Sequence, residues 1–77
     1  MNDIQEKLTT LLNYWIKHNR EHEEEFRDWA EKAMAIPGDI AQQLREAADK
    51  MAAASDDLTK VKQALTKSKE ERQDVSS

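Results

Sequence analysis

Ile36-Pro37-Gly38-Asp39 lies near the middle of the 77-residue chain and contains its one proline and its one glycine. Proline disfavours a helical conformation at the residue before it, and glycine permits the positive φ that a chain reversal needs. Asp39 is a favourable N-cap for a helix that begins directly after it. This stretch therefore predicts a turn that separates two helical segments.

Apolar residues on both sides of this turn recur at spacings of three and four, which is typical of amphipathic helices. Before the turn, the main stripe consists of Ile4, Leu8, Leu11, Trp15, His18, His22, Trp29, Ala33 and Ile36. A neighbouring stripe consists of Leu12, Ile16, Phe26, Ala30 and Ala33. After the turn, the stripe consists of Ile40, Leu44, Ala47, Met51, Ala54, Leu58, Val61 and Leu65. We therefore predict an all-α protein with long helices over about residues 3–35 and 39–69.

Local signals define the ends of these helices. Asn2 or Asp3 can cap the first helix. The second stripe keeps its phase through Ser55, which favours one continuous helix, although Ser55 could also cap a third, short helix. The segment 70–77 is polar and has no apolar period, so we expect a frayed tail after a single domain over residues 1–69.

The turn predicts that the two helices pack antiparallel, with large side chains against small ones. In this register Trp29 lies near Ala47 and Ala48, and His18 lies near Leu58. A hairpin of this length buries only a small core, and a chain without cysteine has no disulfide to support it. We therefore expect a homodimeric four-helix bundle, or docking onto another helical protein. The expected interface residues are Leu12, Trp15, Ile16, Phe26 and Trp29.

The composition argues against several classes of function. Charged residues make up 36% of the chain and the net charge is −4, which disfavours nucleic acids and anionic lipid surfaces as partners. No apolar run approaches the roughly 18 residues of a membrane span, so we expect a cytoplasmic protein. The string His18-x-x-Glu21-His22 matches a metalloprotease pattern, but a chain this short cannot build a substrate cleft around it. We expect no enzymatic activity and no obligatory cofactor.

The histidine pair is the least regular feature of the main stripe. His18 and His22 are four residues apart, so both imidazoles project from one side of the helix. They could be neutral core residues, bonded to each other or to Ser55. Either histidine, together with Asn19, could set helix register or partner choice, as buried polar residues do in coiled coils. They could also bind a transition metal, with added carboxylates or the same pair from a second copy.

The chain also resembles a known family. The string W-x2-H-N-x2-H-x3-F-x2-W-A-x2-A spans Trp15 to Ala33 and resembles an uncharacterised small helical domain of bacteria and archaea. In that family an Ala-rich second helix follows, similar to the segment from Ala47 to Leu58. Some relatives are attached to His-rich or nickel-handling proteins, which implies a metal-binding role for His18 and His22. The family has no assigned activity.

Together these observations predict a non-enzymatic interaction or oligomerisation module. The alternative is an accessory protein that binds nickel or zinc through His18 and His22.

Overall fold

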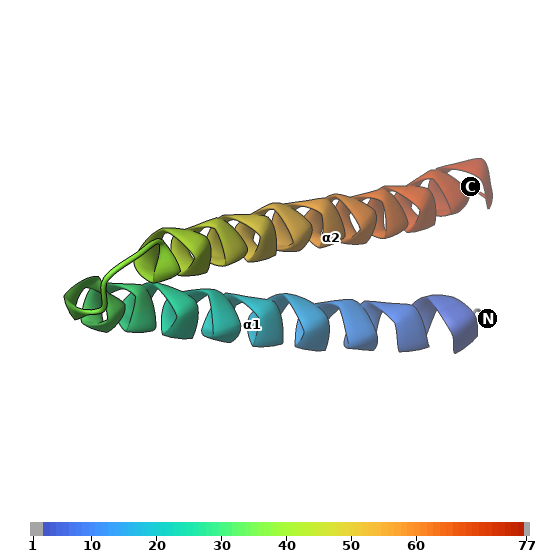
Figure 1. Cartoon of the computed structure of the whole chain (residues 1–77). Helices are drawn as coiled ribbons and strands as arrows, with labels where there is room; N and C mark the ends of the chain where they lie inside the picture. Colours follow the sequence, from blue (N-terminus) through green and yellow to red (C-terminus); the bar gives the residue numbers. More distant parts are fainter. Residues whose placement is uncertain (1–2, 77) are drawn as a thin grey trace.

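The computed structural model describes the backbone of residues 3–76 and the side chains of residues 3–68. It consists of helix α1 (Asp3–Lys32), the 3-10 helix η1 (Ala33–Ala35) and helix α2 (Ile40–Ser76). α1 and α2 lie antiparallel, so both ends of the chain are found at the end of the molecule far from the turn (Figure 1). The predicted helical hairpin is confirmed.

The turn has the predicted backbone conformation. Ile36 is extended, with φ −92° and ψ 131°, and its N–H donates to the carbonyl oxygen of Ala33 at 2.9 Å. Gly38 has a φ of 100°, which residues with a Cβ rarely adopt. The carbonyl of Asp39 accepts the N–H of Gln43 at 2.9 Å and so opens the hydrogen-bond ladder of α2. Proline and glycine therefore end one helix and direct the chain into the next.

The bounds of α2 differ from the prediction at its carboxyl end. The helix is continuous through Ser55, so the alternative with a break at this residue is wrong. It extends to Ser76 rather than ending near Lys69, because Glu, Lys, Arg and Gln in this segment favour helix even without an apolar stripe. The possible cap at Asn2 lies outside the described residues.

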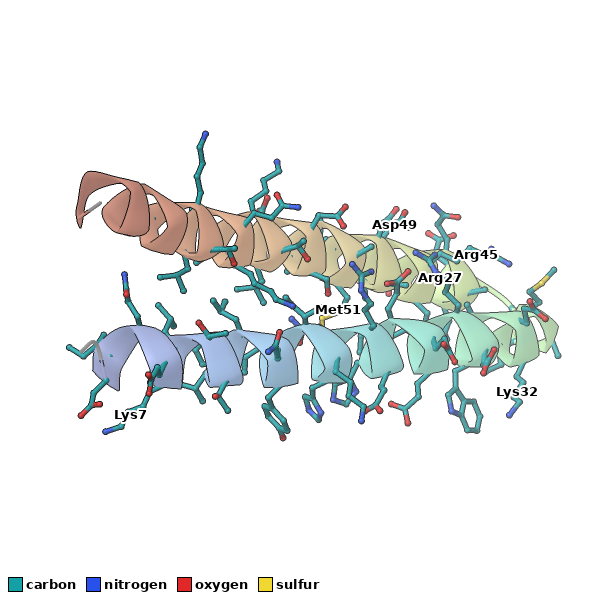
Figure 2. The ribbon with its side chains drawn as sticks, turned by 180° about the vertical axis from the view of Figure 1, so that it is seen from behind. Lys7, Arg27, Lys32, Arg45, Asp49 and Met51 are labelled. Carbon is teal, nitrogen blue, oxygen red and sulfur yellow. The ribbon has the colours of Figure 1, made fainter. Side chains whose placement is uncertain are left out.

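The core of the hairpin is narrow and built from small residues. The buried side chains are Leu12, Ala30, Ala33, Ala48 and Ser55. Leu12 is the one large apolar side chain among them, and the others let the two helices approach closely. Met51 points between the helices (Figure 2). We call the line of α1 residues Leu12, Ile16, Phe26, Ala30 and Ala33 the inner seam.

The main stripe predicted for α1 is therefore not the one that faces α2. Trp15 and Trp29 are exposed rather than packed against the second helix, and His18 is exposed rather than buried. The neighbouring stripe packs instead, since its alanines permit a shorter distance between helices than tryptophan would. Counting about 100° per residue, the helix is rotated by about a quarter of a turn from the predicted orientation.

The predicted axial register agrees with the structure despite this rotation. Arg27 pairs with Asp49 across the helices at 3.2 Å, and Arg20 pairs with Asp56 at 3.7 Å. The two pairs are one heptad apart on each helix, running in opposite directions. Trp29 is thus level with the residues around Ala47, as expected.

The molecule is a rod rather than a sphere. Its principal extents are 63 × 16 × 13 Å and its radius of gyration is 17.8 Å. A compact domain of this length has a radius of gyration of about 11–12 Å. Neither α1 nor α2, over the part of the chain described, has a stretch both long and apolar enough to cross a membrane.

Candidate functional site

The candidate site is an apolar stripe on α1 that α2 leaves uncovered. We call it the outer stripe. His22 is half-buried, and the other residues of the stripe are exposed: Ile4, Leu11, Trp15, His18 and Trp29. The exposed fractions are 78% for Ile4, 38% for Trp15 and 59% for Trp29. Exposed apolar residues that follow one another at helical spacing usually mark an interaction surface.

The outer stripe and the exposed apolar residues of α2 lie on the same broad face of the hairpin. Each helix has a line of residues that faces the other helix: the inner seam on α1, and on α2 the line through the buried residues Ala48 and Ser55. In antiparallel helices, residues that are rotated in the same sense from these two lines lie on the same side of the pair. Ile40 and Val61 are rotated from the line on α2 in the same sense as Trp29 and Trp15 are from the inner seam. Both are exposed, so this apolar face spans both helices.

The opposite face of the hairpin is charged. Arg27 donates two hydrogen bonds to Glu23, of 2.9 and 3.1 Å, and also pairs with Asp49. The hydrogen bond to Glu23 raises the pKa of Arg27 above its usual value. Arg27 and Asp49 lie beside each other on this face in Figure 2, with Arg45 close by. The two faces thus have different chemistry, and the charged face is suited to water.

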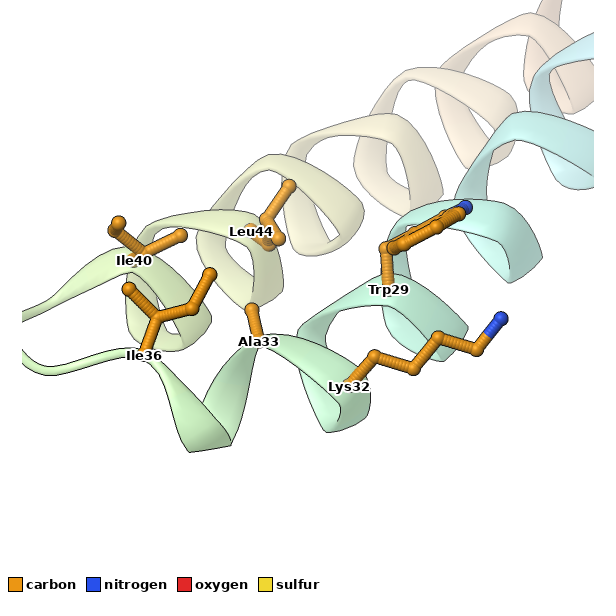
Figure 3. Close-up of a pocket in the computed structure, with 6 residues that line it drawn as sticks. All are labelled: Trp29, Lys32, Ala33, Ile36, Ile40 and Leu44. Carbon is orange, nitrogen blue, oxygen red and sulfur yellow. The ribbon is translucent and has the colours of Figure 1, made fainter.

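At the turn, the apolar face is hollowed into an open pocket. Its lining residues come from both sides of the turn and are Trp29, Lys32, Ala33, Ile36, Ile40 and Leu44 (Figure 3). Its volume is about 230 Å³, enough for an apolar side chain from another molecule. The Lys32 ammonium lies 4.3 Å from the centre of the Trp29 ring, a cation–π contact that orients the indole at the pocket edge.

The two histidines meet in the middle of the outer stripe. Their Nε2 atoms are 3.0 Å apart, and the rings are nearly perpendicular, at 85°. The Nδ1 atom of His22 lies 3.1 Å from Oε1 of Glu25. A carboxylate only accepts hydrogen bonds, so Nδ1 of His22 donates and the Nε2 of neutral His22 accepts from His18.

Aromatic neighbours extend this pair along the helix. Tyr14 stacks on His18 with ring centres 5.5 Å apart, and His22 stacks on Phe26 at 6.0 Å. Tyr14 is 60% exposed and was not predicted as part of the site. Its position four residues before His18 is the signal that identifies it, because i and i+4 side chains on a helix are neighbours.

This arrangement is chemically suited to holding a metal ion. Bonds of about 2.0–2.1 Å in a tetrahedral site place two ligand nitrogens about 3.3–3.4 Å apart, so the 3.0 Å between these nitrogens would have to widen by only a few tenths of an ångström. A carboxylate that accepts the other ring N–H, as Glu25 does from His22, orients histidine ligands in many metal sites. Among the described residues, however, no three His, Cys, Asp or Glu side chains form a group that could hold a metal. One chain therefore offers two ligands.

The residues predicted for the interface do not all lie together. Trp15 and Trp29 lie on the outer stripe, whereas Ile16 and Phe26 are half-buried. Leu12 is 1% exposed, so it serves the contact between α1 and α2 and has no surface for a second molecule. Its inclusion in the interface is corrected by its place in the inner seam. Ile36 and Ile40 at the pocket were not among the predicted interface residues.

The fold and the site define a small antiparallel helical hairpin with one apolar face. The family model that matches residues 8–65 is described as a domain of unknown function (DUF8180), and the chain belongs to this family. An uncharacterised protein of Archaeoglobus fulgidus is 44% identical over 45 residues, covering 58% of this chain and 73% of that protein. No solved structure matches. The predicted membership of an uncharacterised small-domain family is confirmed.

Proposed function

We propose that this protein is a non-enzymatic self-association module, in which the apolar face of one hairpin packs against the same face of a second copy. The observation that carries the proposal is the exposed run of the outer stripe, which extends from Ile4 to Trp29 and continues on α2 at Ile40 and Val61. Two such faces in contact form a four-helix bundle with the charged faces outside. The module is proposed to act in the cytoplasm, to which its highly charged composition is suited.

The surface area of the single hairpin supports this proposal. Its accessible surface is 6075 Å². A compact monomer of the same mass exposes about 4,800 Å². The excess of about 1,300 Å² is larger than the roughly 800 Å² that each partner buries in a standard interface. Dimerisation through the apolar face would thus remove a large part of this excess surface.

The charge distribution of α1 supports an antiparallel arrangement of the two copies. Residues 1–17 carry two carboxylates and two lysines, whereas residues 18–36 carry six carboxylates and three cations. A parallel pair would place the two acidic halves together, and like charges in contact are unfavourable. An antiparallel pair places each acidic half against a neutral half.

Light scattering and sedimentation equilibrium test this proposal. At about 100 μM the protein is expected to have twice the chain mass of 8.9 kDa. Trp29→Glu and Trp15→Glu are expected to shift it to the monomer while circular dichroism remains helical, because a buried unpaired carboxylate is costly at an interface. Asn13→Glu is the matched control, since it adds the same charge to the charged face of α1. A wild-type monomer at this concentration would refute the proposal.

Metal binding is a second candidate function, favoured by the 3.0 Å separation of the Nε2 atoms of His18 and His22. Imidazole ligands suit divalent zinc and nickel. Titration of the protein, purified without a histidine tag, with either ion tests it. Loss of binding in His18→Gln supports this function, and equal binding by the variant refutes it.

A further inference from the structure

We propose that His18 and His22 of two copies together form one four-imidazole site for a divalent transition metal on the twofold axis of the dimer. This inference rests on the proposed self-association. It assigns the ligand set, the stoichiometry and the relative placement of the two copies.

The imidazole nitrogens of the pair lie close together on the exposed stripe. The two Nε2 atoms are 3.0 Å apart, and Glu25 accepts a hydrogen bond from Nδ1 of His22. In this state the Nε2–H of His18 donates a hydrogen bond to Nε2 of His22. When a metal binds, the proton of His18 is carried on Nδ1 instead, so the Nε2 lone pairs of both rings are available as ligands.

The histidine pair of one chain is incomplete as a metal site. Zinc in proteins takes four ligands in a tetrahedron, and the described part of the chain places no third His, Cys, Asp or Glu with this pair. A second copy packed on the same stripe supplies two further nitrogens of the same kind. The site is therefore complete in the dimer and half complete in the monomer.

The remaining residues of the outer stripe fit the same arrangement of two copies. An antiparallel twofold axis that passes between His18 and His22 places His18 beside the partner's His22. The same alignment places Leu11 beside the partner's Trp29, and Ile4 beside the partner's Ile36. Leu11 is 44% exposed, so its side chain is available for contact with an indole.

The pocket at the turn completes this fit. In the same alignment Ile4, which is 78% exposed, lies at the pocket formed by the partner's Ile36 and its neighbours. An isoleucine side chain is apolar and small enough for a pocket of about 230 Å³. Each dimer would contain two such contacts, one at each end, with the histidines at its centre. The apolar contacts thus fix the register that brings the four imidazoles together.

Titration of the untagged protein with Co²⁺ and Zn²⁺ tests the inference. We expect one metal per two chains, and the intense visible absorption of tetrahedral Co²⁺. His18→Gln and His22→Gln are each expected to weaken Zn²⁺ binding at least about 100-fold, since a ligand is lost and even outer-shell changes cost 10–100-fold. Glu25→Gln is expected to weaken it about 10-fold through the positioning of His22, with the dimer mass unchanged. Glu21→Gln, which leaves the pair intact, is the matched control.

The outcomes separate this inference from the proposed function. A dimer that binds no metal, or binds one ion per chain, would refute the four-imidazole site while leaving self-association in place. A metal-free monomer would refute both. Loss of Co²⁺ absorption in Trp29→Glu, which keeps both histidines but is expected to separate the copies, would support the shared site. Unchanged absorption in that variant as a monomer would refute it.

Discussion

Ser55 is the residue at which the core departs most clearly from a purely apolar contact. It is completely buried, and its hydroxyl oxygen finds no hydrogen-bond partner among the described residues. Its backbone carbonyl accepts a hydrogen bond from Thr59 Oγ1 at 2.8 Å. The unsatisfied polar group of Ser55 is therefore its side-chain hydroxyl and not its backbone. Its small size explains its position, because it lets α1 and α2 approach as the buried alanines do.

We predict that Ser55→Ala stabilises the hairpin by about 1 kcal/mol, because the cost of burying an unpaired hydroxyl is removed at nearly constant shape. Urea denaturation followed by circular dichroism measures the change. Ala48→Ser is the matched control, since Ala48 is equally buried one heptad earlier on the same helix, and it should lose a similar amount. A less stable Ser55→Ala variant would contradict this account of the core.

The histidine pair shows what residue spacing could predict and what it could not. A separation of four placed His18 and His22 side by side, and the structure confirms this contact. The interpretation of these histidines as core residues was wrong, because spacing alone does not tell which of two adjacent stripes on α1 packs against α2. Ser55 was considered as their partner, but it lies in the contact between the helices whereas His18 is exposed.

At the scale of the element, the turn was the most predictable part of the fold. Proline and glycine restrict the backbone directly, so their effect does not depend on distant contacts. The rotation of α1 could not be predicted in the same way. The choice between stripes depends on how closely two helices approach, which is a property of the pair. Ala30 opposite small residues of α2 favours close packing, whereas Trp29 would hold the helices apart.

We predict that Gly38→Ala lowers the stability by about 1 kcal/mol, because alanine is strained at a φ of 100°. A Cβ at this position would meet no atom within 4 Å, so the loss would come from the backbone and not from a clash. Thermal unfolding measures it. Gly38→Asn should lose less, since asparagine tolerates positive φ better than alanine. Equal stability of the alanine variant and the wild type would contradict the assigned backbone strain.

At the scale of the whole molecule, the two faces of the hairpin determine how it can behave in water. The cross-helix ion pairs Arg20–Asp56 and Arg27–Asp49 connect the helices on the charged face. Such exposed pairs contribute little to stability, and the inner seam is narrow. The remaining apolar area lies on the opposite face and is removed from water only when a second molecule covers it. Self-association would therefore contribute to the free energy of folding.

This coupling predicts that the unfolding temperature depends on protein concentration. A hundredfold increase, from about 1 to 100 μM, changes the free energy of a dimer by about 2.7 kcal/mol. We expect the midpoint of thermal unfolding to rise by about 5–10 °C over this range. Trp29→Glu should melt at a lower temperature that does not vary with concentration, because the separated hairpin unfolds alone. Asn13→Glu should retain the dependence of the wild type, since its charge lies on the face that stays in water. A wild-type midpoint that is constant across the range would mean that the inner seam alone holds the two helices together.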